Sequence, residues 1–225
     1  MPLPVSSLVA YLTRGHEDGI EWRPKDFETA KFIKAIKGDP IKGYAQILWN
    51  GRYHRIEDGK DGRVVAFQLF GEMAADYLRR QHAGLLADTL TFVPIPSSQT
   101  TLASPADHLF VSLVLAKKLA AACGKQAEVE DVLRWQSQMS SARSGGTRAP
   151  GYLYDHLVVT KKPLGTSPHI LIDDVCTSGG HLRAAATRLK EAGANVVLAL
   201  CAGRTVHDQV DDPYQILEVI APDYP

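Results

Sequence analysis

Short apolar runs alternate along the chain with longer stretches whose apolar residues recur at helical spacing. Recurrence at positions i, i+3 and i+4 predicts an amphipathic helix, whereas a short continuous apolar run predicts a buried strand. Helices are therefore expected at residues 5–13, 27–36, 64–80, 107–123 and from 182 to a stop at Gly193. Strands are expected at residues 44–49, 91–96, 129–135, 170–172 and 196–200. The alternation of strands and helices predicts an α/β fold with a mainly parallel central sheet flanked by helices.

The first third of the chain shows no arrangement of residues that is typical of a catalytic site. Residues 1–90 are predicted to form a lobe packed against a core of residues 91–225. In this lobe Asp26 is a candidate N-cap for the helix that follows it. Asn50-Gly51 is a strong turn signal after a predicted strand, so the lobe is expected to contain a β-hairpin.

Two acidic residues and a glycine-rich loop follow the apolar run at 170–172. Asp173 and Asp174 end the predicted strand, and Thr177-Ser178-Gly179-Gly180 leads into the predicted helix. Glycines let backbone N–H groups approach an anion, and a helix N-terminus favours negative charge. The carboxylates would repel a phosphate, so they suit sugar hydroxyls or a divalent cation. The stretch predicts a site for a phosphorylated sugar with free hydroxyls; an ordinary strand-to-helix turn with solvated acids is the alternative.

A second loop of small polar residues follows the apolar strand at 91–96. Its residues are Ser97, Ser98, Gln99 and Thr100. Ligands of open α/β sheets bind at the carboxyl ends of the strands, so this loop is a candidate second part of the site. A plain solvated turn is the alternative, because residues 94–116 contain neither lysine nor arginine.

Composition narrows the classes of protein. The 225 residues are 45% hydrophobic and 22% charged, with a formal net charge of zero, as in ordinary globular proteins. Zero net charge argues against a broad nucleic-acid-binding surface but leaves a local basic patch open as an alternative. No apolar run is long enough to span a membrane. The first ten residues lack the charged start and long apolar centre of a signal peptide.

The three cysteines, Cys123, Cys176 and Cys201, are scattered along the chain. This spacing fits neither a disulfide framework nor a Cys-x-x-Cys zinc site, and a reducing cytoplasm is the expected compartment. Cys176 lies inside the glycine-rich loop, next to a predicted helix N-terminus. It is either a reactive thiol or simply a small residue that fits there.

The sequence Asp-Asp-Val-x-Thr-Ser-Gly-Gly at 173–180 resembles the signature with which type I phosphoribosyltransferases bind 5-phosphoribosyl 1-pyrophosphate (PRPP). The resemblance implies that family's α/β fold, with a small N-terminal hood that here contains the hairpin. It implies that Asp173 and Asp174 hold the ribose 2′- and 3′-hydroxyls while the loop holds the 5′-phosphate. The implied PRPP-binding residues are Asp173, Asp174, Val175, Cys176, Thr177, Ser178, Gly179, Gly180 and His181. Position 181 is usually Thr or Ser in the family.

The same resemblance assigns roles to two other loops. Residues 97–100 would contact the pyrophosphate of PRPP, and Mg²⁺ would accompany PRPP without a dedicated set of protein ligands, reaching the acid pair through water or ribose hydroxyls. The irregular stretch 136–152 stands where the family has a flexible loop that closes over PRPP. Arg143 and Arg148 of this stretch would be catalytic cations for the departing pyrophosphate, acting with the acid pair; a disordered basic surface loop is the alternative.

A sharper resemblance is to the ComF-like, competence-associated branch of that family. It rests on the order of features across residues 27–204, such as the apolar-Lys-Gly helix end at 32–39 and the Val-Pro-Ile-Pro strand at 93–96. The zinc ribbon and the Arg-Gly-Phe-Asn-Gln motif of that branch are absent, so the chain would be a divergent relative. Purine-salvage members carry an Asp where this chain has Thr177, which argues against hypoxanthine or guanine as the base.

Three functions are weighed on these observations. The first is a cytoplasmic, Mg²⁺-dependent phosphoribosyltransferase that displaces pyrophosphate from PRPP with a nitrogenous base. The second is a PRPP- or nucleotide-binding regulatory or DNA-handling accessory protein without turnover, which the uncharged loop at 97–100 favours. A sugar-phosphate hydrolase is less favoured, because no Ser-His-Asp arrangement or metal-ligand cluster is recognisable. The base itself is left open, with Trp22, Trp49, Tyr53 and Tyr77 as aromatic residues that either stack on it or belong to the core. Dimers are common in the family, but the sequence does not predict one.

Overall fold

The computed structural model describes residues 2–87, 89–105, 107–125, 127–139, 149–161 and 166–221. Its helices are α1 (Pro24–Lys37), α2 (Lys60–Gln81), α3 (Val111–Cys123), α4 (Pro150–His156) and α5 (Gly180–Glu191), with 3-10 turns at His16–Asp18 and Ala83–Ala87. Five strands of its central sheet are β1 (Leu3–Leu12), β4 (Leu90–Pro94), β8 (Pro168–Cys176), β9 (Asn195–Val206) and β10 (Leu217–Ala221). The remaining strands are β2 (Tyr44–Trp49), β3 (Arg52–Glu57), β5 (Ala127–Val129), β6 (Leu133–Trp135) and β7 (Leu157–Val159).

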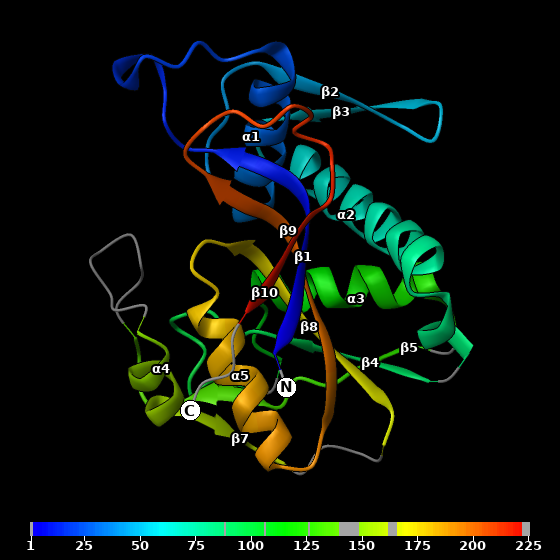
Figure 1. The fold of residues 1–225 in the computed structure, drawn as a ribbon, viewed down its shortest axis with the longest axis vertical. Helices are drawn as coiled ribbons and strands as arrows, with labels where there is room; N and C mark the ends of the chain where they lie inside the picture. Colours follow the sequence, from blue (N-terminus) through cyan, green and yellow to red (C-terminus); the bar gives the residue numbers. More distant parts are fainter. Residues whose placement is uncertain are drawn as a thin grey trace.

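A six-stranded sheet lies at the centre of the described structure, in the order β10-β1-β9-β8-β4-β5 (Figure 1). Neighbouring strands are parallel except at one edge, where β10 runs antiparallel to β1. Helices cover both faces, so the predicted α/β fold with a mainly parallel, helix-flanked sheet is confirmed. The carboxyl ends of β4 and β8 lie side by side, because Thr91–Pro94 pairs in register with His169–Ile172.

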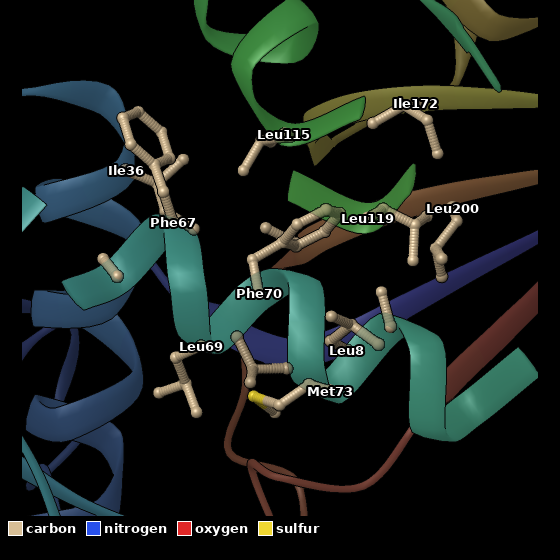
Figure 2. Close-up of a cluster of buried hydrophobic side chains, with 14 of the residues drawn as sticks. Leu8, Ile36, Phe67, Leu69, Phe70, Met73, Leu115, Leu119, Ile172 and Leu200 are labelled. Atoms are coloured by element: carbon tan, nitrogen blue, oxygen red, sulfur yellow. The ribbon is translucent and has the colours of Figure 1, made fainter. Parts of the chain in front are cut away.

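Each face of the sheet has its own apolar core. On one face, α1, α2 and α3 pack on alternate residues of β4, β8 and β9, which include Phe92, Ile172 and Leu200. Figure 2 shows this cluster, with aromatic and aliphatic side chains of α2 meeting Leu115 and Leu119 of α3. On the other face, α5 and the short β6 pack on the intervening residues, among them Leu171. This two-sided burial explains why the sheet strands are continuous apolar runs.

The predicted helix at 5–13 is wrong, because this segment forms β1 in the central sheet. Val5, Leu8, Val9 and Leu12 are all buried, and their i, i+3, i+4, i+7 spacing matches a helix. A strand covered on both faces has no polar side to produce an alternating pattern, so periodicity does not separate it from a helix. Residues 3–12 thus belong to the central sheet, although the sequence had placed them in the N-terminal lobe.

Three smaller corrections concern where elements begin and end. Helix α1 begins at Pro24 with Arg23 as N-cap, while Asp26 stands at N3 and accepts hydrogen bonds from the Arg23 backbone and side chain. The helix expected at 107–123 begins only at Val111. The strand expected at 129–135 is broken into β5 and β6, and β6 pairs with β7 in a separate small sheet.

The other predicted elements are confirmed. Helix α2 and strands β2, β4, β8 and β9 occupy the expected stretches, and Gly193 ends α5 with a positive φ of 91°. Strands β2 and β3 form the predicted hairpin, and Asn50 and Gly51 at its turn have φ values of 49° and 73°. Two successive positive φ values are what a type I′ turn requires, which is why Asn-Gly is favoured there.

Candidate functional site

A cavity of about 350 Å³ opens at the carboxyl ends of β4 and β8. It is lined by every residue from Asp173 to Leu182 and also by Ser97 and Ser98, which are the two loops that the sequence singled out. Gln99 and Thr100 do not line it: Gln99 is exposed, and the buried Thr100 hydrogen-bonds through Oγ1 to Ser97 Oγ at 2.8 Å. Parallel pairing of β4 with β8 brings the loops together, as is typical of ligand sites in open α/β sheets.

The glycine-rich loop turns sharply into α5. Gly179 is the N-cap of this helix with φ 73° and ψ 9°, a left-handed conformation that glycine adopts at no steric cost. Gly180, His181 and Leu182, the first residues of α5, line the same cavity as the loop, so the N-terminal end of this helix lies at the cavity. Thr177 Oγ1 is hydrogen-bonded to Thr205 Oγ1 of β9 at 2.8 Å, which ties the loop to the sheet. The loop has the backbone shape and the helix end that bind anions.

His181, the unusual residue of this loop, packs against an aromatic ring. Its ring centre lies 5.7 Å from that of Trp135, and the two planes are inclined by 60°. Trp135 is fully buried in β6, and its indole N–H donates to the Pro96 carbonyl at 3.3 Å. The tryptophan thus links the loop after β8 to the loop after β4.

The two acids of the site are held by a chain of hydrogen bonds. Ser112 of α3 donates to Asp173 Oδ1 at 3.2 Å, and the backbone N–H of Asp174 donates to the same oxygen at 2.8 Å. The N–H of Val175 donates to Asp174 Oδ1 at 2.7 Å. Burial and the neighbouring Asp174 carboxylate raise the pKa of Asp173 well above its ordinary value. A cation or hydroxyl donors beside Asp173 would therefore favour its ionised form.

We expect Asp173→Asn to stabilise the ligand-free protein at neutral pH. Because the folded-state pKa of Asp173 is raised, the native state loses stability as pH rises from about 4 through that pKa. Asparagine removes the half-buried carboxylate and keeps the acceptor oxygen for Ser112, so the variant should unfold at a higher temperature than the wild type near pH 7. Thermal unfolding between pH 4.5 and 8, followed by circular dichroism, measures this difference.

The exposed Asp208→Asn is the matched control for that measurement and should not change the pH profile. The stabilisation by Asp173→Asn should shrink as pH falls towards 4. A variant that is less stable than the wild type at pH 8 would contradict the inference that the ionised Asp173 carboxylate destabilises the ligand-free protein.

The loop after β4 is held by backbone contacts. Met139 N–H donates to the Ser98 carbonyl at 2.9 Å, and Trp135 N–H donates to the Thr100 carbonyl at 3.0 Å. Ile95 N–H donates to Ile172 of β8 at 2.9 Å. These contacts leave Ser97 and Ser98 at the cavity wall, where they can offer hydroxyl groups to a ligand.

Cys176 is a buried thiol in the cavity wall beside Cys201 of β9. A hydrogen bond from Cys201, against the opposing effect of burial and with help from the Arg204 guanidinium, lowers the pKa of Cys176 to about 7. The Arg204 nitrogen lies 3.8 Å from Cys176 Sγ. Donation to Cys176, together with burial, raises the pKa of Cys201 well above its ordinary value.

Several residues of the cavity were not identified from the sequence as part of a site. They are Lys37 of α1, Val111 and Ser112 of α3, Trp135 of β6, and Ile95, Pro96, Met139, Leu153 and Leu182. Lys37 lies in the stretch 32–39 that carried the family resemblance, which was a usable signal. No comparable signal in the sequence points to Ser112 and Trp135. The packing of α3 brings Ser112 to Asp173, and the packing of β6 brings Trp135 to His181 of the loop.

Other sequence candidates lie elsewhere. Trp22, Trp49, Tyr53 and Tyr77 do not line this cavity; Tyr53 is 70% exposed, and Tyr77 is buried with its hydroxyl bonded to Ser6, His82 and Glu218. Arg143 and Arg148 fall outside the described residues.

Two searches of the described residues bear on cofactors and membranes. Among the described residues, no group of three or more His, Cys, Asp or Glu side chains is arranged to hold a metal ion. Likewise, none of the helices in the described ranges combines the length and apolar character needed to cross a bilayer.

Comparison of the chain with known proteins does not assign it to a family. No model of a known protein family matches the chain, and no curated protein sequence matches it. The resemblance at 173–180 therefore stays a prediction from the sequence.

Proposed function

We propose that the chain binds PRPP and transfers its phosphoribosyl group to a nitrogenous base, as a divergent type I phosphoribosyltransferase with a ComF-like sequence. The observation that supports this most is the single cavity shared by the acid pair, the loop leading into α5, and Ser97 and Ser98. PRPP has a 5′-phosphate, a ribose diol and a pyrophosphate. The loop leading into α5 suits the phosphate, the acid pair suits the diol, and Ser97 and Ser98 suit the pyrophosphate.

Each wall would act on one part of the ligand. The 5′-phosphate would take the backbone N–H groups at 177–181 and the N-terminus of α5. Asp173 and Asp174 would accept hydrogen bonds from the ribose hydroxyls, and Ser97 and Ser98 would donate to the pyrophosphate. In the reaction, the base nitrogen forms a bond to C1 of the ribose while the C1–oxygen bond to pyrophosphate breaks. The acid pair would fix the ribose as positive charge develops on its ring.

Magnesium fits the donors of this cavity as a partner of the ligand. Asp173 and Asp174 supply carboxylate oxygens, which are the donors that Mg²⁺ prefers, and it commonly keeps waters and substrate phosphates as its other ligands. When bound, it would neutralise charge on the departing pyrophosphate.

Calorimetric titration of PRPP with Mg²⁺ into the wild type and an Asp173→Asn/Asp174→Asn variant tests the site. We expect binding by the wild type and a loss of about 100-fold or more in the variant, because two acceptors for ribose hydroxyls become weaker ones. The variant's stability, expected to be retained or raised, excludes unfolding as the cause. No binding to the wild type would overturn the proposal, and pyrophosphate release with a panel of bases then tests turnover.

A non-catalytic PRPP- or nucleotide-binding protein is the second candidate. It is favoured by the absence of lysine and arginine from residues 94–116, which leaves the expected pyrophosphate loop without a cation of its own. Tight PRPP binding without pyrophosphate release for any base would select this candidate.

A further inference from the structure

The cavity contains one strong cation on its described walls, and it comes from the N-terminal part of the chain. Lys37, in the last turn of α1, is the only lysine or arginine among the lining residues that the structure describes. It is partly buried, and its Nζ lies 5.5 Å from the centre of the Tyr11 ring. Its ammonium group has neither an ion pair nor a hydrogen bond with any other described residue. The lysine and the acid pair therefore line the same cavity without a direct bond between them.

Lys37 comes to the cavity from the β9 side of β8. Its helix lies directly on β9, because a Cβ at Gly203 would come within 2.6 Å of Ile33 Cδ1, one turn before Lys37. Tyr11, the ring next to Lys37, belongs to β1 and pairs with Thr205 of β9. In the sheet order, β1 and β9 lie on one side of β8 and β4 lies on the other (Figure 1).

The loop with Ser97 and Ser98 reaches the same acids from the β4 side. A nucleophile that displaces a leaving group in line attacks C1 from the face opposite to that group. With pyrophosphate on the β4 side, the acceptor approaches from the β9 side, where Lys37 lies. The residue that meets the acceptor therefore carries a positive charge.

We propose that Lys37 binds a carboxylate of the acceptor, so that the preferred base is an acidic heterocycle and not a neutral one. The inference rests on the proposed phosphoribosyltransferase function and names its substrate class. A single ammonium matches the single charge of a carboxylate. A phosphate on the acceptor would carry a charge of about −2. The carboxylates of Asp173 and Asp174 would repel it more strongly than a singly charged carboxylate.

A variant at Lys34 is the control that distinguishes acceptor binding by Lys37 from a purely structural role of Lys37 in α1. Both lysines lie in the last turn of α1, where positive charge is favourable beside the helix C-terminus. Lys34 is exposed and is not part of the cavity wall. A Lys34→Met variant therefore loses only the favourable interaction of a positive charge with the C-terminal end of α1. Lys37→Met loses this interaction and also the positive charge at the cavity. Methionine keeps most of the length of the lysine side chain in both variants.

The experiment compares pairs of bases that differ by a carboxylate. Orotate and uracil, then nicotinate and nicotinamide, are titrated calorimetrically into protein saturated with ribose 5-phosphate and magnesium pyrophosphate, which fill the PRPP positions without a reactive bond. We expect the wild type and Lys34→Met to bind at least one acid about tenfold or more tightly than its neutral partner. In Lys37→Met this preference should fall to about twofold or less.

Three results would overturn the inference. In the first, the wild type binds PRPP but binds neither orotate nor nicotinate more tightly than its neutral partner, or binds no base at all. Another is an acid preference that survives in Lys37→Met. The third is loss of ribose 5-phosphate or pyrophosphate binding in Lys37→Met, which would assign the lysine to PRPP itself. Failure of the wild type to bind PRPP at all is the distinct result that removes the proposed function too.

Discussion

Replacing Trp135 by alanine is expected to lower the free energy of unfolding by about 3–5 kcal/mol, the usual cost of emptying a buried tryptophan position. The side chain is 1% exposed in the core formed by α5 and β6. Its indole N–H bonds to Pro96, and its ring lies against His181, so both loops of the site lose a contact at once. We therefore also expect weaker PRPP binding in any fraction that folds. Urea unfolding followed by circular dichroism measures the first effect, and calorimetry measures the second.

Trp135→Phe separates the volume of the side chain from its hydrogen bond. Phenylalanine fills most of the space but cannot donate to the Pro96 carbonyl. The expected loss is about 1–2 kcal/mol, and the His181 contact is largely kept. If Trp135→Ala cost less than about 1 kcal/mol, β6 would not be a structural support for the two loops.

Gly62→Ala is expected to destabilise the protein by about 3 kcal/mol or more, at the upper end of overpacking effects. Gly62 lies in the first turn of α2, and an added Cβ would be 1.8 Å from the Glu57 carbonyl oxygen and 2.7 Å from the Glu57 nitrogen. Both are backbone atoms at the end of β3, so no side-chain rotation relieves the clash. Either the start of α2 or the end of the hairpin must move. Thermal and urea unfolding of the purified variant measure the loss.

Gly84→Ala is the matched control for that variant. No atom lies within 4 Å of a Cβ added at Gly84, and the residue does not need a positive φ. We expect its stability to stay within about 0.5 kcal/mol of the wild type, as for other surface substitutions. Equal stability of the two variants would mean that the contact between α2 and β3 is not tight in solution.

The glycine-rich part of the candidate site could be predicted from the sequence because it is continuous in the chain. The apolar run, the acid pair, the loop and the following helix all lie between residues 170 and 192, and the structure places them as β8, the cavity wall and α5. Local rules of strand burial, glycine conformation and helix N-termini are enough for such a segment. The Asn50-Gly51 turn was predictable for the same reason.

Rules based on local sequence gave the wrong secondary structure where a segment pairs with strands far away in the chain. The apolar residues of β1 have helical spacing, but β9 and β10 pair with both edges of this segment and make it a strand. The stretch 129–135 is expected to be one strand, yet only β5 continues the central sheet, while β6 turns away to pair with β7. In each case, hydrogen bonds to strands far along the chain outweigh the local pattern.

The sequence by itself determined the α/β class, the parallel sheet and the loop that carries the acid pair. Only the tertiary structure decided which other groups face that loop. Ser112, Trp135 and Lys37 come from three elements separated along the chain, and they line the same cavity because of the strand order and the close contact of α1 with Gly203. Strand order depends on which buried surfaces fit together across the whole core, and no local stretch of sequence encodes that fit.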